Sequence, residues 1–303
     1  MEKRPQFGQR FLTDDAEVFA HNAWDMVDWG EEQEVAAQDT VSKNSCRPSE
    51  DVYQDVLNNS AEKWDKFYGI HNNKFFKDRH WLFTEFPELK ETSENVERVN
   101  IFEVGCGAGN TIFPIIEHSD ENANIFVYGC DFSSTAVDIV KSSKLYSDDK
   151  CHAFVCDISQ KSLQVPIPEE SLDLITMIFV LSALNPDDMA HCIQNLSKYL
   201  KPGGHILFRD YGRYDLAQLR FKNGRCLSDN FYARGDGTKV YFFTQDEMDK
   251  LFTDAGLEKV QNIVDRRLQV NRARKLKMYR VWIQCKYAKP IANVTKSAEI
   301  NLS

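Results

Sequence analysis

The sequence has no hydrophobic stretch long enough to cross a membrane. Its longest apolar run, which ends near Leu184, covers about ten residues, half of the roughly 20 that a spanning helix needs. The first ten residues carry basic side chains but no apolar segment, so we do not expect a secretory signal there. Acids at positions 14, 15 and 17 argue against a mitochondrial transit peptide. We therefore expect a cytoplasmic protein.

Paired cysteine motifs are absent as well. The chain has eight cysteines, yet none of them form a Cys-x-x-Cys pair. Half of them lie in or beside apolar strands: Cys106, Cys130, Cys156 and Cys285. This usage is typical of small buried side chains in a reducing compartment, so we expect neither disulfides nor a metal site.

The chain also lacks internal repeats and an overall excess of basic charge. Its 303 residues suffice for one large domain or two small ones, and 42% hydrophobic residues suffice for a sizeable core. The net charge of −9 taken alone argues against nucleic-acid binding. The first 60 residues are acidic and weakly periodic, with Phe19, Trp24 and Trp29 as docking groups, and residues 40–50 are typical of a linker.

Residues 101–109, IFEVGCGAG, form an apolar strand that leads into Gly105, Gly107 and Gly109. Glycine has no Cβ atom, so the backbone can turn sharply and approach a ligand closely. Asp131 ends the next apolar strand, 22 residues after Gly109, where a carboxylate can accept two hydrogen bonds from a ribose diol. The glycines alone are typical of an ordinary tight turn, but together with this acid they indicate a nucleoside-cofactor pocket.

The glycine spacing favours one class of nucleoside cofactor. Dinucleotide sites prefer Gly-x-Gly-x-x-Gly, which places the pyrophosphate at a helix N-terminus. Here the spacing is Gly-x-Gly-x-Gly, and Glu103 precedes it, where a carboxylate repels a pyrophosphate but attracts an ammonium group. Asp157 ends a third strand and is placed to accept from an adenine amine, while Ile178 lies near one adenine face. We therefore favour S-adenosylmethionine over NAD.

From residue 98 onward, strands and helices alternate. This order is typical of a parallel sheet covered on both faces, whose ligands bind at the carboxyl ends of the strands. A hairpin at Asp236-Gly237, a helix ending at Gly256 and an antiparallel final pair of strands should follow. The expected strands are 99–104, 124–130, 152–157, 172–181 and 205–210, the last entered through a turn at 201–204, and the expected helices are 51–70, 110–118, 134–143 and 186–200.

Basic residues are concentrated in two groups despite the acidic total. The first lies between Asp265 and Arg280 and has seven basic residues and one acid. The second, from Arg209 to Arg234, is interleaved with aromatic residues. Such groups suit phosphate contact and stacking on unpaired bases, although a single charge run is also typical of a solvated face. The RNA-binding candidates are Arg209, Tyr211, Arg213, Tyr214, Arg234, Arg266, Arg267, Arg272, Arg274 and Lys275.

Several sequence blocks together resemble the methyltransferase-like tRNA 3-methylcytidine methyltransferases. The blocks are FFKDRHW (75–81), EVGCGAGN (103–110), CDFS (130–133), IFVLSA (178–183), LFRDYGRYD (207–215) and NFYARGDGTKVYFFT (230–244). The likeness covers most of the chain, and FFKDRHW and FRDYGRYD are specific because they are not general cofactor-fold motifs. HNAWDMVDW and DRRLQVNR look closest to the branch acting on threonine and arginine tRNAs. The link from FPEL to the glycine strand is short here, which puts only accessory contacts in doubt.

The resemblance implies an α/β protein of the class I S-adenosylmethionine-dependent methyltransferase type. Its Rossmann-like, mostly parallel sheet should have seven strands, with an N-terminal helical extension and RNA-binding insertions. We expect three segments: a partly helical acidic extension over 1–60, the methyltransferase catalytic domain over 61–290, and a disordered tail over 291–303.

The resemblance also implies methylation of N3 of an unpaired cytidine at position 32 in the tRNA anticodon loop. We expect the anticodon arm of tRNA as a partner. Whether an accessory protein or a tRNA synthetase also takes part is left open. Trp64 and Tyr68 share a helix face, which is also typical of core anchors. Arg79 and His80 are candidates for the cofactor carboxylate or an RNA phosphate. The resulting cofactor-binding set is Trp64, Tyr68, Arg79, Glu103, Gly105, Gly107, Asp131, Asp157, Ile158 and Ile178.

This reaction needs few catalytic groups. Cytosine N3 has its own lone pair, so no base is needed, and the enzyme mainly positions the reactants. The methylated ring is cationic, and a nearby carboxylate would stabilise its developing charge. Asp210, at a strand end, is the catalytic candidate, with an ion pair to Arg209 or Arg213 as the equally weighted structural alternative.

Other functions are also compatible with parts of this pattern. A non-catalytic RNA-binding scaffold could keep the fold, although the acids at 103, 131, 157 and 210 argue against it. A methyltransferase for a protein or small molecule would need little basic surface around its cleft. An NAD oxidoreductase is disfavoured by the glycine spacing. A scaffold need not bind S-adenosylmethionine, so cofactor binding distinguishes it from the methyltransferases. Added RNA would not affect a methyltransferase for a protein or small molecule, so RNA competition distinguishes it from a tRNA methyltransferase.

Overall fold

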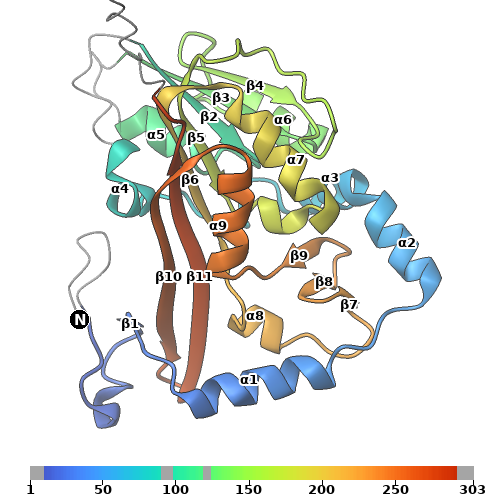
Figure 1. Cartoon of the computed structure of the whole chain (residues 1–303), viewed down its shortest axis with the longest axis vertical. Helices are drawn as coiled ribbons and strands as arrows, with labels where there is room; N and C mark the ends of the chain where they lie inside the picture. The colour runs from blue at the N-terminus through green and yellow to red at the C-terminus, as the bar shows by residue number, and fades with distance from the viewer. Residues whose placement is uncertain (1–9, 90–97, 119–123, 292–303) are drawn as a thin grey trace, which may run out of the picture.

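The computed structural model describes residues 10–89, 98–118 and 124–291. Its main element is an eight-stranded sheet with the strand order β1-β10-β11-β6-β5-β2-β3-β4. Helices lie on both faces of this sheet (Figure 1). The α/β class predicted from alternating strands and helices is therefore confirmed.

The parallel half of the sheet comes from the alternating segment of the chain. Its strands are β2 (Val99–Val104), β3 (Ile125–Asp131), β4 (Cys151–Val155), β5 (Leu172–Ile178) and β6 (Leu200–Tyr211). Their burial on both sides explains the near-continuous apolar runs in the sequence. The separate turn predicted at 201–204 is wrong. The strand already begins at Leu200, and a register shift against β5 absorbs these residues.

The antiparallel half is a long hairpin of β10 (Glu258–Asn271) and β11 (Leu276–Ala288), as predicted for the final pair. β11 pairs with β6 only from Trp282 onward, so the tip of the hairpin extends beyond the carboxyl end of β6. A short strand, β1 (Ala23–Asp25), adds to β10 as an eighth strand that the sequence did not indicate. Trp24 of β1 is buried, and its indole N–H donates to the Val18 carbonyl at 2.8 Å.

Two hydrophobic layers hold the helices against the sheet. On one face lie α4 (Leu82–Glu85), α5 (Ile112–His118) and α6 (Ser134–Lys141). On the other face lie α7 (Pro186–Ser197) and α9 (Gln245–Asp254). The start of α9 follows from its sequence, because Thr244 and Glu247 form a capping box.

The N-terminal helices differ from the prediction. α1 (Glu31–Lys43) runs into the predicted linker at 40–50. The predicted helix 51–70 is two helices, α2 (Glu50–Asn58) and α3 (Ser60–His71), which are separated at Asn59. The backbone at Asn59 is not helical, with φ −110° and ψ 31°. Side-chain hydrogen bonds connect the two helices, since Asn59, at 2.7 Å, and Lys63, at 2.6 Å, both donate to Asp55.

A second, three-stranded sheet follows β6 and the short helix α8 (Leu216–Leu219). It consists of β7 (Cys226–Ser228), β8 (Phe231–Ala233) and β9 (Lys239–Tyr241). β8 and β9 form the hairpin predicted at Asp236-Gly237, and Gly237 has a φ of +84°. Helix α2 packs against this small sheet through Val56 (Figure 1). The short 3-10 helices include η1 (Asp15–Glu17), η2 (Pro87–Leu89) and η4 (Leu181–Ala183). Of the tail predicted at 291–303, residues 292–303 lie outside the described part of the chain.

Candidate active site

A cleft of about 250 Å³ lies at the carboxyl ends of the parallel strands. The strand order changes direction between β2 and β5, because β2 is followed in sequence by β3 on one side and flanked by β5 on the other. Ligands of open α/β sheets bind at such a switch point. The cleft brings together the predicted cofactor residues Trp64, Tyr68, Arg79, Gly105, Gly107, Asp131, Asp157, Ile158 and Ile178.

The glycine loop after β2 needs its glycines. Gly105, Gly107 and Gly109 have φ values of +64°, +51° and +88°, a region that disfavours residues with a Cβ atom. Space is limiting too, since a Cβ atom on Gly107 would lie 2.4 Å from the Tyr68 hydroxyl oxygen. The loop can therefore bring its backbone close to a ligand only with this composition.

Asp131 ends β3 at the wall of the cleft. Its Oδ2 atom accepts from the Gly107 N–H at 2.9 Å, and its Oδ1 atom accepts from the Ser133 N–H at 3.0 Å. Burial raises the pKa of this carboxyl to about 6, although these backbone hydrogen bonds lower it. Each oxygen keeps a lone pair, so the carboxylate can still accept hydrogen bonds from a ligand.

Asp157 follows β4 in the same cleft, beside Ile158 and Ile178. Burial acts to raise its pKa, but hydrogen bonds from Ser159 and Gln160 outweigh burial and the pKa is lowered. Asp157 is therefore the more readily ionised of the two strand-end acids. The pairing of an acid with two apolar side chains suits a flat ring that carries an amine at its edge.

Helix α3 contributes the aromatic side of the cleft. The rings of Trp64 and Tyr68 stack with centroids 5.9 Å apart, as expected from their spacing of four residues. Burial raises the pKa of the Tyr68 hydroxyl well above its usual value, so this group stays protonated and can donate. Both residues are at once core contacts of α3 and walls of the cleft.

Glu103 does not lie on the cleft wall formed by the described residues. It is fully buried in β2, where it accepts from the Thr176 hydroxyl and pairs with Arg79 at 3.4 Å. Burial raises its pKa to about 7, against the lowering effect of Arg79. Arg79 also donates to the Thr111 hydroxyl at 2.9 Å and itself lines the cleft. Glu103 therefore holds Arg79, which carries a cationic group of the cleft.

Asp210 is fully buried and is not among the described side chains that line the cleft. Its oxygens accept from the backbone N–H groups of Ser182, at 2.9 Å, and Tyr211, at 2.8 Å. Burial raises its pKa to about 6. Neither Arg209 nor Arg213 is its ion-pair partner, since they pair with Asp265 and Glu247. Asp210 instead fixes η4, which ends at the cleft residue Ala183 and is followed by the cleft residue Leu184.

Three of the RNA-binding candidates are engaged inside the protein. Arg209 is buried and pairs with Asp265, with its guanidinium 4.7 Å from the centre of the Trp282 ring. Arg213 donates to Glu247 at 2.8 Å and to the Phe242 carbonyl at 3.0 Å. Arg267 pairs with Glu85 at 2.6 Å and with Asp265 at 3.0 Å. These contacts give each of the three arginines a structural role.

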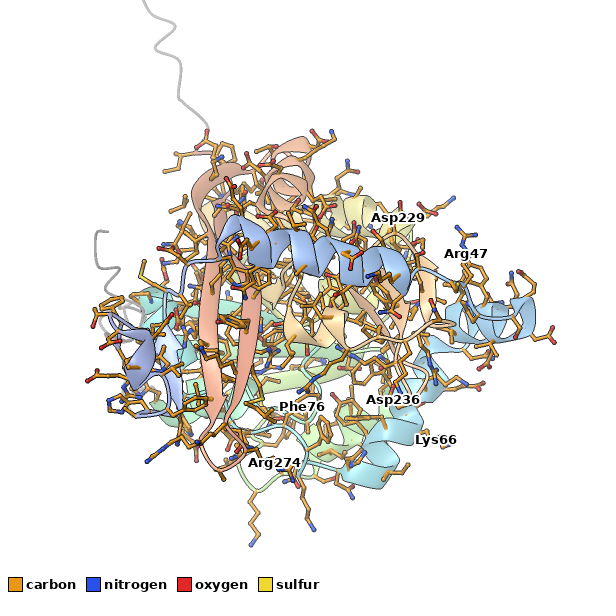
Figure 2. The ribbon with its side chains drawn as sticks, turned by 90° about the horizontal axis from the view of Figure 1, so that it is seen from below. Arg47, Lys66, Phe76, Asp229, Asp236 and Arg274 are labelled. Atoms are coloured by element: carbon orange, nitrogen blue, oxygen red, sulfur yellow. The ribbon has the colours of Figure 1, made fainter. Side chains whose placement is uncertain are left out.

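The other candidates differ in exposure. Arg272, Arg274 and Lys275 are exposed at the tip of the β10–β11 hairpin, and Figure 2 shows Arg274 at the edge of the lower face. Near the sheet, Arg234 lies over the Tyr211 ring at 5.4 Å. The half-buried candidates Tyr214 and Arg266 line a second hollow between α1 and α9, away from the cleft: Trp29, Glu34, Tyr214, Gln245, Arg266 and Val281 are among its walls.

Lys239 and Phe179 are among the cleft residues that the sequence did not indicate. Lys239 of β9 lines the cleft although it is 4% exposed, and its ammonium donates to the Asn185 side chain at 2.7 Å. Burial lowers its pKa to about 8. Phe179, also in the cleft, has a φ of +61°, which is rare for a bulky residue and recurs at functional sites. Neither residue belongs to a motif whose spacing predicts a binding site, because only the tertiary fold brings them to the cleft.

The described residues contain no group of three or more His, Cys, Asp or Glu that could hold a metal ion. None of the helices within the described ranges is long and apolar enough to cross a membrane.

Comparisons with known proteins agree with this geometry. Residues 102–206 match the family model of a methyltransferase domain. The chain is 56% identical over 322 residues to the tRNA N(3)-cytidine methyltransferase METTL2 of Xenopus tropicalis, and the match covers 95% of each chain. It is 45% identical over 289 residues to the tRNA(Thr) (cytosine(32)-N(3))-methyltransferase of Saccharomyces cerevisiae, covering 94% of this chain and 46% of that protein.

The fold has solved counterparts as well. An S-adenosylmethionine-dependent methyltransferase from Clostridium acetobutylicum is similar with a TM-score of 0.52 at 14% identity, covering 76% of this chain and 98% of that one. The predicted class I methyltransferase fold is therefore confirmed.

Proposed function

Because this chain belongs to the tRNA N(3)-cytidine methyltransferase family, we propose that it transfers a methyl group from S-adenosylmethionine to N3 of an unpaired cytidine at position 32 of the tRNA anticodon loop. Besides family membership, one observation carries this proposal. The glycine loop, Asp131 and Asp157 meet in a single cleft at the switch point of the sheet.

The residues of the cleft fit this cofactor. Asp131 has lone pairs for a ribose diol, and Asp157 has them for an adenine amine beside Ile158 and Ile178. Arg79, held by Glu103, supplies a positive charge for the amino-acid carboxylate. The glycine loop packs closely beside these groups, and a Cβ atom at position 107 would clash with the Tyr68 hydroxyl.

The chemistry follows from the substrate. When bound, the cofactor supplies an electrophilic methyl group on a sulfonium. The N3 lone pair of cytidine forms the new N–C bond while the S–C bond breaks, and no proton has to leave N3. The base therefore needs only to be unpaired, turned into the cleft and aligned, which the protein achieves by positioning.

Asp210 acts in this proposal as a positioning residue. It holds the backbone of Ser182 and Tyr211, and the two residues after Ser182, Ala183 and Leu184, line the cleft. Its buried negative charge also stabilises the positive charge that develops on the cytosine ring. RNA contact by Arg272, Arg274 and Lys275 stays a prediction, which their exposure at the hairpin tip supports.

A methylation assay tests the proposal. Unmodified tRNA transcripts with cytidine 32, and matched transcripts with uridine 32, are incubated with the protein and isotopically labelled S-adenosylmethionine. Mass spectrometry of the nucleosides should show labelled 3-methylcytidine only with cytidine 32. Binding of the cofactor without methylation of any tRNA would instead support a non-catalytic RNA-binding scaffold. Label in protein or in small molecules would support a methyltransferase for those substrates.

A further inference from the structure

An exposed aromatic ring lies beside the cleft residue Phe76. Phe75, in the loop after α3, is 55% exposed, which is unusual for phenylalanine. Its ring is nevertheless held by three others, with centroid distances of 4.8 Å to Phe67, 5.0 Å to His71 and 4.9 Å to Phe76. The exposed part of Phe75 is thus a fixed apolar surface and not a loose side chain.

The surface around Phe75 is basic, in contrast to the acidic chain. Residues 66–77, KFYGIHNNKFFK, contain three lysines and no acid, while the whole chain has a net charge of −9. Lys66, Lys74 and Lys77 are all exposed. Asp78, the next residue, is engaged by the Asn110 side chain at 3.0 Å. A fixed ring among free lysines is complementary to a base and its neighbouring phosphates.

The inner end of this loop is fastened to the cofactor site. The Asn110 amide donates to the Phe76 carbonyl at 3.3 Å as well as to Asp78, and the Arg79 N–H donates to the Asn110 carbonyl at 2.9 Å. Asn110 directly follows the glycine loop, and Phe76, Arg79 and Asn110 all line the cleft. Figure 2 shows Phe76 on the lower face, between the β10–β11 hairpin and the α3 residue Lys66.

We propose that the loop 71–77 is a binding surface for unpaired anticodon-loop nucleotides next to the methylated cytidine, with Phe75 stacking on one base and Lys74 and Lys77 contacting phosphates. A base that is turned into the cleft carries its neighbouring nucleotides close to the cleft, which this loop adjoins through Phe76. The lysines favour RNA over an apolar protein partner, which would gain nothing from exposed ammonium groups. The inference rests on the proposed function, because it assumes a tRNA substrate.

The test compares tRNA binding by Phe75→Ala, Phe75→Trp and the control Val260→Ala. Val260 is 54% exposed on β10, near the end of the hairpin opposite its tip, so it matches Phe75 in exposure only. Stacking on one base is worth about 1–3 kcal/mol, so Phe75→Ala should weaken tRNA binding roughly five- to hundredfold. Phe75→Trp should keep the affinity, and all three variants should bind S-adenosylmethionine like the wild type. Phe75→Ala loses its ring contacts and should melt at a somewhat lower temperature, so melting curves establish that each variant is folded at the assay temperature.

A second readout reports stacking itself. A fluorescent purine beside position 32 should be quenched when the wild-type protein binds, and this quenching should be lost with Phe75→Ala. The double variant Lys74→Ala/Lys77→Ala should reduce the slope of log affinity against log salt by about two contacts' worth. Unchanged tRNA affinity and quenching in Phe75→Ala would overturn the inference and leave the loop as a surface for another partner. Absence of 3-methylcytidine with the wild-type protein would instead count against the proposed function.

Discussion

The carboxylate of Asp131 accepts a hydrogen bond from the backbone N–H of Gly107, with 2.9 Å between Oδ2 and N. This bond joins the acid at the end of β3 to the glycine loop after β2. The second oxygen of Asp131 is held by the Ser133 N–H at 3.0 Å. The groups that should receive the cofactor are therefore fixed before any ligand binds, which reduces the entropic cost of binding.

Asp131→Ala should weaken S-adenosylmethionine binding tenfold or more. Charge-assisted hydrogen bonds contribute about 1.5–3 kcal/mol each, and this variant removes the acceptor of the ribose diol. Calorimetric titration measures the affinity, and a melting curve checks the fold. Wild-type affinity in a folded variant would remove Asp131 from the site.

The affinity for S-adenosylmethionine should rise as the pH increases through about 6. Burial raises the Asp131 pKa to about 6, and only the ionised form makes charge-assisted hydrogen bonds. Titrations between pH 5 and pH 7.5 should show tighter binding with rising pH for the wild type and a flatter profile for Asp131→Asn. If both proteins show the same pH profile, another group such as Glu103 is responsible.

Folding stability should respond to the Asp131 carboxyl in the opposite direction. Its pKa in the folded protein, about 6, exceeds the ordinary value of 3.8. The stability it contributes is therefore fully present below the ordinary value and is lost as the pH rises through 6. Denaturant unfolding at several pH values should show that Asp131→Asn loses less stability over this window than the wild type, and equal losses would contradict the raised pKa.

Gly107→Ala should weaken cofactor binding and lower stability. The new Cβ atom would lie 2.4 Å from the Tyr68 hydroxyl oxygen, and a positive φ costs an alanine about 1–2 kcal/mol. Tyr68→Phe removes that oxygen, so the double variant should recover part of the loss. A double-mutant cycle on stability measures this coupling. If the changes in unfolding free energy of the two single variants simply add, the alanine Cβ does not clash with the Tyr68 hydroxyl.

Asp210→Asn should leave cofactor affinity near the wild-type value and lower the rate of methyl transfer. The amide keeps the shape of the side chain but loses the negative charge and replaces one acceptor with a donor that faces the backbone N–H of Ser182 or Tyr211. Single-turnover methylation measured against pH gives the readout. With a pKa of about 6 for Asp210, the wild-type rate should rise through that pH and the variant should not. A wild-type rate and profile in the variant would exclude both roles.

Arg272→Ala/Arg274→Ala should weaken tRNA binding and flatten its salt dependence by about two phosphate contacts. Both side chains are exposed at the hairpin tip, so melting and S-adenosylmethionine binding should not change. Arg267→Ala is the matched contrast, because it breaks ion pairs to Glu85 and Asp265 and should lower the melting temperature. An unchanged salt slope in the double variant would leave the tip as a solvated surface.

The local pattern of the sequence is sufficient for the parallel half of the fold. Apolar strands followed by Asp131 and Asp157 must end at the same edge, because parallel strands share their direction. The α2–α3 break shows the limit of such reasoning. The sequence across Asn59 predicts one helix, but Val56 of α2 packs on the small sheet and Tyr68 of α3 packs in a different cluster beside the glycine loop.

Charge shows most clearly what the sequence determined and what the tertiary structure decided. The sequence alone established the glycine loop, the strand-end acids and a basic C-terminal run, because these depend on residue type and spacing. It did not decide which arginines face solvent. Arg267 and Arg272 belong to the same run, yet the fold brings Glu85, distant in sequence, to Arg267 and leaves Arg272 exposed at the hairpin tip. Partners so distant in sequence meet only through tertiary packing, which is also why Lys239 in the cleft and the buried Asp210 behind it required the structure.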